Sequence, residues 1–257
     1  MILTRLSTHG ILLLIMEALS ARQTQILKAL IDEYIETALP VGSLALEKKY
    51  NLGVSPATIR NEMAALTKAG FLKQPYTSAG RVPTPSAMKF YINQLMEEKK
   101  LSVADEVRAK EGVWEVRNDF DVLMDKATRA LSQKTKTLSV AATVDGSTWS
   151  HGYSQVFNNP EFNNFQVCQN LFSLIEQEKR LVELFFGKFT GLSQIEVLFG
   201  EELGWEYFDP VGIVATRFNV RGNEGAIGVI GPFRLNYSAV IPVVRYFGDL
   251  VEQVAKK

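Results

Sequence analysis

The residues best suited to catalysis or metal binding in this chain are few, and they do not form a recognisable site. The two histidines are His9 and His151, and neither has a cysteine or an acid at the spacing typical of zinc ligands. Glu201 and Glu202 are adjacent, so their side chains point in different directions, and no partner base is evident. We therefore predict no catalytic residue, no metal and no cofactor, and we expect a protein that is not an enzyme.

Two further features could suggest chemistry but have simpler explanations. Cys168 is the single cysteine and falls on the apolar stripe of a predicted helix, so we expect a core residue, with a redox sensor as the alternative. Gly228 and Gly231 flank a predicted strand and lack the spacing of a phosphate-binding loop, which favours close packing or turning. With no disulfide framework possible, the cytoplasm is the expected compartment.

Length and composition indicate a globular protein of two domains. The chain has 257 residues, of which 46% are hydrophobic and 22% are charged. The apolar run from Ile11 to Met16 is too short for a bilayer, which needs about 20 residues, so we predict no membrane segment. A capped helix begins soon after Met16, so we expect residues 1–16 to be an N-terminal extension outside the fold, with translation starting at Met16.

Charge is distributed unevenly along the chain, although the net charge is zero. Residues 48–89 contain seven basic residues and one acid, Glu62, for a local charge of +6, so the remainder carries −6. A basic segment in a neutral protein is typical of a surface that displaces counterions from nucleic-acid phosphates. A solvated face that happens to be basic is the alternative.

The elements that carry this charge have the pattern of a helix-turn-helix. Ser20 and Gln23 form a capping box at the start of a first helix, which ends before Leu39 and Pro40. Ser43 is expected to cap a second, shorter helix, which ends at the turn from Asn51 to Gly53. A third helix is expected from the N-cap Ser55, with Pro56 at its first position, to Gly70.

The third predicted helix has two different sides. At 100° per residue, Ile59, Glu62, Met63 and Leu66 fall on one side, and the other side collects Ala57, Arg60, Asn61, Ala64 and Lys68. Arginine can bind guanine through two hydrogen bonds, asparagine can do the same with adenine, and alanine permits close approach to a thymine methyl. This outer side therefore suits recognition in the major groove. A three-helix domain with a polar exterior is the alternative.

A β-hairpin is expected after this helix, with strands from Phe71 to Gln74 and from Arg81 to Thr84. This position is that of the wing in a winged helix, and its tip carries donors suited to phosphates or to a minor groove. Thr84 and Pro85 then begin another helix, whose apolar residues are expected to pack. The DNA-binding residues that we expect are Ser43, Ser55, Ala57, Thr58, Arg60, Asn61, Ala64, Lys68, Tyr76, Thr77, Ser78 and Arg81.

Two long motifs in this region resemble a known family. The run Ser55-Pro56-Ala57-Thr58-Ile59-Arg60-Asn61-Glu62-Met63 and the run Gln74-Pro75-Tyr76-Thr77-Ser78-Ala79-Gly80-Arg81-Val82-Pro83-Thr84 are similar to the heat-inducible transcription repressor HrcA family. Pro40-Val41-Gly42-Ser43, Gly228-Val229-Ile230-Gly231-Pro232 and Asn236-Tyr237 resemble the same family. The resemblance implies a repressor of chaperone operons that binds an inverted-repeat operator as a homodimer, supported by the chaperonin GroEL.

Downstream of the basic segment the pattern predicts an α+β domain. Residues 97–112 are polar and charged, as in a linker or an exposed helix end, and a helix is expected from Val113 to Leu131. Strands are expected over residues 138–144, 195–199, 211–220 and 226–230, and the last two are joined by a turn over 221–225. Helices are expected from Phe165 to Ile175 and over 238–254, and Pro242 falls within about the first turn of the last helix.

By resemblance this second domain is GAF-like, but members of the family usually carry an inserted dimerisation subdomain for which this chain has too few residues. We therefore expect residues 17–96 to be a winged helix-turn-helix, 97–112 a linker, and 113–257 a GAF-like regulatory or dimerisation domain. The dimer interface is expected to involve the second domain or the helix from Val113. The alternative functions are a regulator whose second domain senses a small ligand, and a protein-docking module without a DNA role.

Overall fold

The computed structural model describes residues 19–255, which form two compact units, one ending at Met96 and the other beginning at Glu97. Each unit is described by itself. The predicted N-terminal extension, residues 1–16, lies outside the described residues. Between residues 19 and 255, no helix combines the length and apolar character needed to cross a bilayer.

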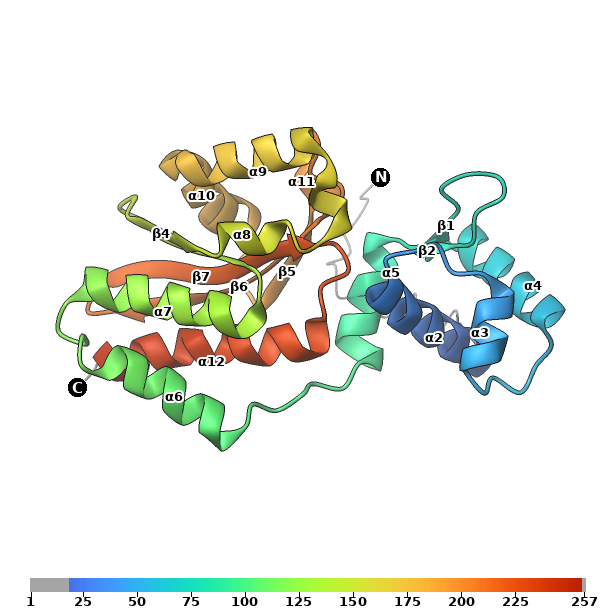
Figure 1. Cartoon of the computed structure of the whole chain (residues 1–257), viewed down its shortest axis with the longest axis horizontal. Helices are drawn as coiled ribbons and strands as arrows, with labels where there is room; N and C mark the ends of the chain where they lie inside the picture. Colours follow the sequence, from blue (N-terminus) through green and yellow to red (C-terminus); the bar gives the residue numbers. More distant parts are fainter. Residues whose placement is uncertain (1–18, 256–257) are drawn as a thin grey trace, which may run out of the picture. The chain divides into compact units, whose positions relative to one another are not determined.

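Unit 1, which we define as the described residues up to Met96, is a helical domain with a small antiparallel hairpin (Figure 1). Its elements are α2 (Ala21–Thr37), α3 (Ser43–Lys49), α4 (Pro56–Lys68), β1 (Leu72–Lys73), β2 (Val82–Pro83), α5 (Pro85–Phe90) and the π-helical turn η1 (Tyr91–Leu95). The order of helix, short helix, helix and hairpin is that of a winged helix-turn-helix. The architecture predicted for this part of the chain is confirmed.

Side-chain caps determine where most helices of unit 1 begin. Ser20 and Gln23 form the predicted capping box, Ser55 Oγ accepts the amide of Thr58 at 3.2 Å, and Thr84 caps α5. The cap predicted for α3 is wrong. Ser43 is the first residue of α3 and is buried, and the N-cap is Gly42, which makes no side-chain hydrogen bond. Because the extended residue is Gly42, with φ −97° and ψ 155°, the helix starts at Ser43, one residue earlier than a Ser43 cap requires.

The wing of unit 1 is attached to the loop that precedes α3. Val41 and Arg81 exchange two backbone hydrogen bonds of 2.8 Å, which adds a short antiparallel bridge beside the β1–β2 pair. A Cβ atom at Gly80 would lie 2.4 Å from the carbonyl carbon and oxygen of Val41. The backbone at the root of the wing can approach this closely only because residue 80 has no side chain.

Unit 2, which runs from Glu97, is an α+β domain, as predicted (Figure 1). Its elements are α6 (Val103–Trp114), α7 (Phe120–Thr135), β3 (Leu138–Thr143), β4 (Thr148–His151), α8 (Tyr153–Val156), η2 (Pro160–Asn163), α9 (Phe165–Glu176), α10 (Glu178–Val182), η3 (Glu183–Lys188), β5 (Glu196–Phe199), α11 (Gly200–Leu203), β6 (Val211–Val220), β7 (Asn223–Pro232) and α12 (Tyr237–Ala255).

The sheet of unit 2 has five antiparallel strands in the order β4-β3-β7-β6-β5. Helices α7 and α12 cover one face, and α8 to α10 cover the other (Figure 1). Strands β6 and β7 are joined by the two-residue turn Arg221-Gly222, in which both residues have positive φ, as tight hairpins require. The turn is shorter than predicted because β7 already begins at Asn223.

Two expectations for unit 2 are corrected, and one strand was missed. Most of the segment predicted as a linker, residues 97–112, belongs to α6, because Ser102 caps a helix whose Val113 is buried. The helix predicted from Val113 to Leu131 is two helices, since Asp119 accepts the amide of Val122 and starts α7. Strand β4 was not predicted, because its four residues form no apolar run.

The segment that begins unit 2 is fixed to α12 at a defect in that helix. Pro242 has no amide hydrogen, so the carbonyl of Ser238 has no helical donor, and the amide of Lys99 donates to it at 2.8 Å. Next to this bond, Glu98 and Arg245 form a bidentate pair of 2.7 and 2.8 Å. The hydrogen bonds from Arg245 hold the pKa of Glu98 below its ordinary value.

The Glu98–Arg245 pair predicts a pH-dependent contribution to the stability of unit 2. A depressed carboxylate pKa stabilises the fold above the ordinary pKa, and this contribution is lost as pH falls through the depressed value. In a double-mutant cycle of Glu98→Gln and Arg245→Gln, we expect a coupling energy of about 0.5–1 kcal/mol at pH 7, because both groups are partly exposed. Urea unfolding should show the coupling vanish as pH falls through the depressed pKa of Glu98, and a coupling that is the same at low pH would contradict this.

Candidate nucleic-acid interface

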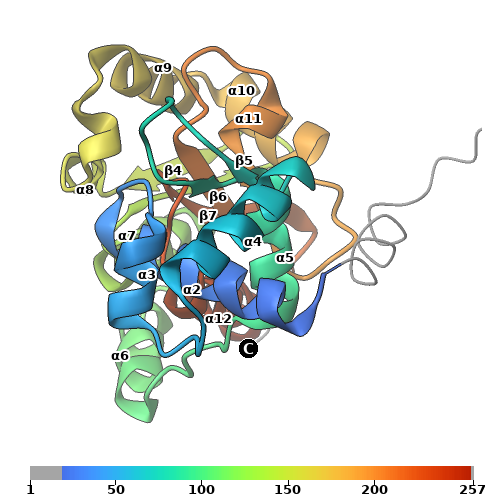
Figure 2. The ribbon, with the colours of Figure 1, turned by 90° about the vertical axis from the view of Figure 1, so that its right-hand side faces the viewer.

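The outer side of α4 is exposed along its whole length. Ala57, Arg60, Asn61, Ala64 and Lys68 are all exposed, as predicted, and α4 and the wing loop form the side of unit 1 turned toward the viewer in Figure 2. Within the described part of the chain, neither Arg60 nor Lys68 forms an ion pair. Both cations and the amide of Asn61 are therefore available to an external ligand.

The inner side of α4 fixes which residues face outward. Ile59, Met63 and Leu66 are buried, with exposed fractions of 4% or less. Glu62 lies at the margin of this side, where its carboxylate accepts a hydrogen bond of 3.1 Å from Gln23 and lies 3.6 Å from Arg22 of α2. The acid of α4 is thus turned toward α2 and paired with a cation, so it does not oppose phosphate binding on the outer side.

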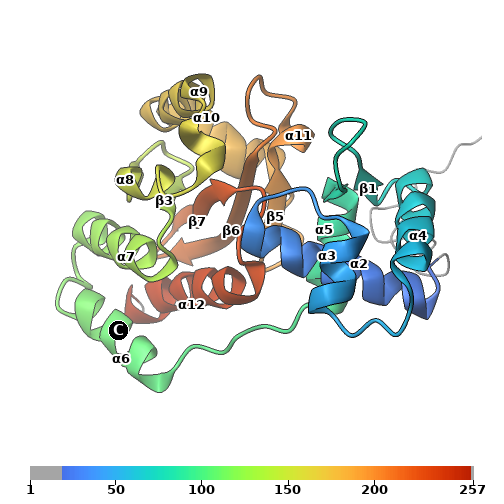
Figure 3. The same cartoon turned by 45° about the vertical axis from the view of Figure 1, so that its right-hand side comes forward.

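Hydrogen bonds brace the wing loop from within and attach it to α4. The side-chain amide of Gln74 donates to the carbonyls of Thr77 and Ala79, at 2.7 and 3.0 Å. The guanidinium of Arg81 donates to Thr67 Oγ1 on α4 at 3.1 Å and to the carbonyl of Gly80 at 3.4 Å. Figure 3 shows α4 together with β1 and the loop. These hydrogen bonds hold the wing loop in a defined position beside α4.

The twelve predicted DNA-binding residues differ in their exposure to solvent. Eight of them are exposed: Ser55, Ala57, Arg60, Asn61, Ala64, Lys68, Thr77 and Ser78. Tyr76 is also exposed, by 63%, at the wing tip. Thr58 and Arg81 are half-buried, and Ser43 is buried. The buried hydroxyl of Ser43 is not on the exposed surface, and the hydroxyl of Ser55 is occupied as the cap of α4.

Lys49 contributes less to the basic surface than the charge count suggested. Its ammonium lies 2.7 Å from Glu33 and 2.5 Å from Glu36, both on α2 and both outside the basic segment of the sequence. These hydrogen bonds hold the pKa of Lys49 above its ordinary value. The ammonium therefore stays charged, but its charge is balanced within unit 1.

Three residues of this interface were not predicted: Thr67, Gln74 and Gly80. All three residues position the wing. Thr67 and Gly80 do so through contacts with residues that are distant in sequence, and Gln74 does so through hydrogen bonds within the folded loop. A glycine and an amide beside a predicted turn were visible in the sequence, but their partners were not. Lys48 lies exposed near the end of α3 and is a further cation of the helix-turn-helix. It was not among the predicted DNA-binding residues.

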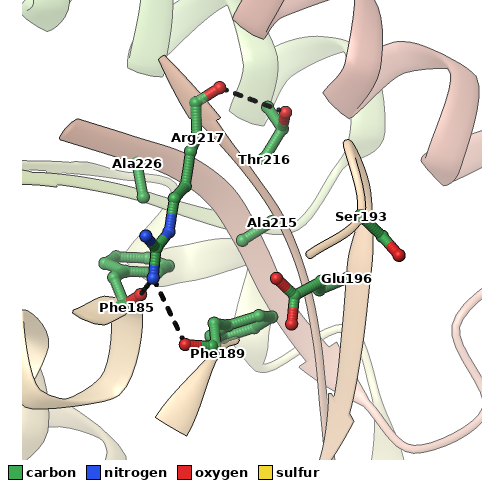
Figure 4. A pocket seen from close by; sticks show the side chains of 8 residues that line it. All are labelled: Phe185, Phe189, Ser193, Glu196, Ala215, Thr216, Arg217 and Ala226. Carbon is green, nitrogen blue, oxygen red and sulfur yellow. Dashed lines mark hydrogen bonds between the residues drawn. The ribbon is translucent and has the colours of Figure 1, made fainter. Parts of the chain in front are cut away.

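Unit 2 contains a cavity between η3, β6 and β7 that is too small for an organic ligand. Its volume is about 10 Å³, enough for about one water molecule. The Arg217 guanidinium lines it and donates to the carbonyls of Phe185 and Phe189, at 3.4 and 3.3 Å (Figure 4). Larger hollows, of about 250 and 670 Å³, lie along α6, are open to solvent and are lined by several charged side chains.

His151 has an acidic neighbour that its position in the sequence did not indicate. Its Nε2 lies 2.7 Å from Asp125 of α7. Burial acts to raise the pKa of Asp125, but the hydrogen bond and charge of His151 outweigh it, so the pKa is lowered. Within residues 19–255, no group of three or more His, Cys, Asp or Glu side chains is placed to hold a metal ion.

Comparison with known proteins identifies the family. The family description "HrcA protein C terminal domain" matches residues 83–241, which is more than half of the chain. The chain belongs to the HrcA family. The heat-inducible transcription repressor HrcA of Carboxydothermus hydrogenoformans is 25% identical over 91% of this chain and 97% of its own length. HrcA of Acetivibrio thermocellus is 43% identical over 124 residues, covering 48% of this chain and 35% of the relative. The resemblance stated from the motifs is confirmed.

The same comparisons show what this HrcA chain lacks. The alignment with the Carboxydothermus repressor runs over 334 positions, more than the 257 residues of this chain, so the relative contains residues with no counterpart here. A crystal structure titled only as a hypothetical protein has the same fold, with a TM-score of 0.74 and 17% identity over 93% of this chain and 98% of its own. This chain is thus shorter than the Carboxydothermus relative, and its fold is shared by the hypothetical protein.

The close approach at the wing root predicts that two glycine substitutions in unit 1 differ in their effect on its free energy of unfolding. Gly80→Ala places a Cβ against the backbone of Val41 and should reduce the free energy of unfolding of unit 1 by about 1–3 kcal/mol. Gly42→Ala is the steric control within unit 1, because a Cβ there meets no atom within 4 Å and the backbone φ is negative. It should cost less, about 0.5 kcal/mol, because alanine is a poorer N-cap residue than glycine. Thermal and urea unfolding followed by circular dichroism would measure both. Equal stability of the two variants would contradict the packing described at the wing root.

Proposed function

We propose that this chain is a DNA-binding repressor of heat-shock (chaperone) operons that binds an inverted-repeat operator as a homodimer in the cytoplasm. Unit 1 is the DNA-binding domain, and unit 2 is the regulatory and dimerisation domain. The observation that carries the proposal is the outer side of α4, where Arg60, Asn61 and Lys68 are exposed between small alanine side chains. Membership in a family whose relatives are named heat-inducible transcription repressors supports the same function.

The contacts we propose divide into two kinds. Arg60 and Asn61 read base edges in the major groove, and Ala57 and Ala64 permit close approach of the helix. Lys68 and the wing-tip residues Tyr76, Thr77 and Ser78 bind phosphates or the adjacent minor groove. Ser55 and Thr58, at the start of α4, contribute through the helix N-terminus.

Arg81 acts by positioning the wing, because its guanidinium is directed to Thr67 and to carbonyls of the loop. Ser43 acts only through the packing of α3, since it is buried. A two-fold operator requires a two-fold protein, so that two copies of α4 enter major grooves about one helical turn apart.

Repression is proposed to occur by occlusion, with the dimer placed over the operator so that polymerase cannot start. Heat acts by unfolding or dissociating a marginally stable repressor, and GroEL supports the active state. A loss of about 1.4 kcal/mol in folding or dimer stability shifts the corresponding equilibrium about tenfold. A small-ligand sensor is the alternative. The cavity between η3, β6 and β7 gives it no support, because its volume of about 10 Å³ is far below the roughly 300 Å³ that organic ligands need. The larger hollows along α6 are open to solvent and lined by several charged side chains, unlike the concave, mostly apolar sites that bind such ligands.

Arg60→Ala tests whether α4 reads sequence. The loss of a two-point contact to a base should reduce discrimination between the inverted repeat and a scrambled duplex by about 1–3 kcal/mol. Lys68→Ala should weaken binding to both duplexes similarly and make the dependence on salt shallower by about one phosphate contact. Mobility-shift titrations at several salt concentrations would measure these effects.

The matched control for this experiment is Arg129→Ala. Arg129 is an exposed arginine on α7 of unit 2, so the substitution removes the same charge away from α4. Its operator affinity should equal that of the unsubstituted chain. If Arg60→Ala and Arg129→Ala have the same discrimination, α4 does not read bases and the proposed function fails at its main point.

A temperature ramp tests the proposed regulation separately from DNA reading. Purified protein on operator DNA should lose occupancy steeply as temperature rises, and GroEL should move the midpoint to a higher temperature. The measurement is fluorescence anisotropy of labelled operator, with a heat-stable DNA-binding protein as control. Occupancy that does not change with temperature or with GroEL would contradict heat-dependent regulation but would leave operator binding intact.

A further inference from the structure

The surface formed by α8, η2 and α9 is rich in aromatic residues and nearly free of charge. Residues 152–177 contain five aromatic residues and only two charged ones, Glu161 and Glu176, whereas charged residues are 22% of the chain. Glu161 is held by Arg234 at 2.5 and 3.2 Å, and both side chains are largely buried. Aromatic enrichment with depletion of charge is typical of the centre of a protein–protein interface.

Four aromatic side chains on this surface make up what we call the aromatic patch: the exposed Tyr153, Phe157 and Phe165, and Phe172, which is half-buried against the core of unit 2. The ring of Phe172 lies 5.8 Å from that of Tyr153 and 6.0 Å from that of Phe157, between ring centroids. Phe165 precedes Phe172 by seven residues in α9 and so lies on the same side of that helix. Phe157 and Phe165 are 59% and 76% exposed, which leaves a large apolar area in water.

The side chains around the patch are amides. Asn158, Asn163, Asn164, Gln166 and Gln169 are all exposed. An amide both donates and accepts hydrogen bonds, so it can pair with a copy of itself. An aromatic centre with an amide rim therefore has the anatomy of an interface whose polar groups can be satisfied by an identical surface.

We infer that the aromatic patch is the surface through which a second copy of this chain binds, by a two-fold contact between the α8–α9 regions of unit 2. A surface that meets its own copy cannot carry a strong charge of one sign, and this one carries almost none. A phosphate-bearing partner, such as a nucleic acid, does not fit this surface, because the patch offers no cation to bind it. The inference rests on the proposed function, which requires a dimer, and assigns the interface in a chain shorter than its relatives.

The test is sedimentation equilibrium on the full chain and on three variants. The first is the double variant Phe157→Asn/Phe165→Asn, in which two exposed rings are removed. The second is Gln169→Glu, which adds a carboxylate to a surface that would face its own copy. The third is the control Leu192→Asn, at a residue that is 89% exposed in a different loop of unit 2. Circular dichroism of each variant checks that the fold is retained.

The double variant should raise the dimer dissociation constant at least about thirtyfold. Gln169→Glu should weaken the dimer most at low salt, and Leu192→Asn should leave it unchanged. Dimers of undiminished affinity in both patch variants would overturn the inference, as would a monomeric full chain. A monomer whose patch is protected from hydrogen exchange would assign the patch to another segment of the same chain, which also overturns it.

The failure of this inference is distinguishable from the failure of the proposed function. A chain that binds the inverted repeat but dimerises equally well in all variants refutes only the interface. A chain that forms the patch-dependent dimer but binds no operator refutes the proposed function and leaves the interface in place.

Discussion

The rotation of α4 about its own axis is the constraint on which the interface depends. Ile59, Met63 and Leu66 are buried on one side of the helix, and burying each side chain is worth about 1.5–3 kcal/mol. Turning α4 by half a turn would expose all three and bury Arg60 and Asn61 without partners, which is costly in both respects. The identity of the outward residues therefore follows from the packing of the inward ones.

The wing adds a second contact region held in a fixed relation to the first. Arg81 connects the hairpin to Thr67 of α4, and Val41 connects it to the loop before α3. Because these bonds are made within unit 1, they restrict the wing by themselves, and a restricted wing loses less conformational entropy on association. Helix and wing thus act as one preformed surface.

Local signals allowed most of unit 1 to be predicted from the sequence. The caps Ser20, Ser55 and Thr84 and the helical spacing of apolar residues located the helices, because these features act within a single turn. Ser43 was misassigned since a serine at a helix start can be either the cap or the first helical residue, and packing decided between them.

The features that were missed depend on contacts between distant segments. The helical spacing from Val113 onward continued across Asp119, so a new cap inside an apolar pattern was not distinguishable from an ordinary helix position. Strand β4 is defined by pairing with β3, and its short polar sequence gave no signal. The role of Arg81 and the exposure of the aromatic patch also required the folded chain, because sequence spacing does not show which apolar residues lack a partner surface.

The most direct test of the account places a DNA-cleaving probe on the outer side of α4. An iron chelate attached to Asn61→Cys would be selective, because Cys168, the single native cysteine, is buried. Bound to an inverted-repeat operator, the labelled protein should cleave both strands at two symmetric positions whose pattern matches major-groove attack, and the unsubstituted chain treated alike should not cleave. Cleavage that is absent or uniform along the duplex, although the protein is bound, would contradict the assignment of α4 as the reading helix.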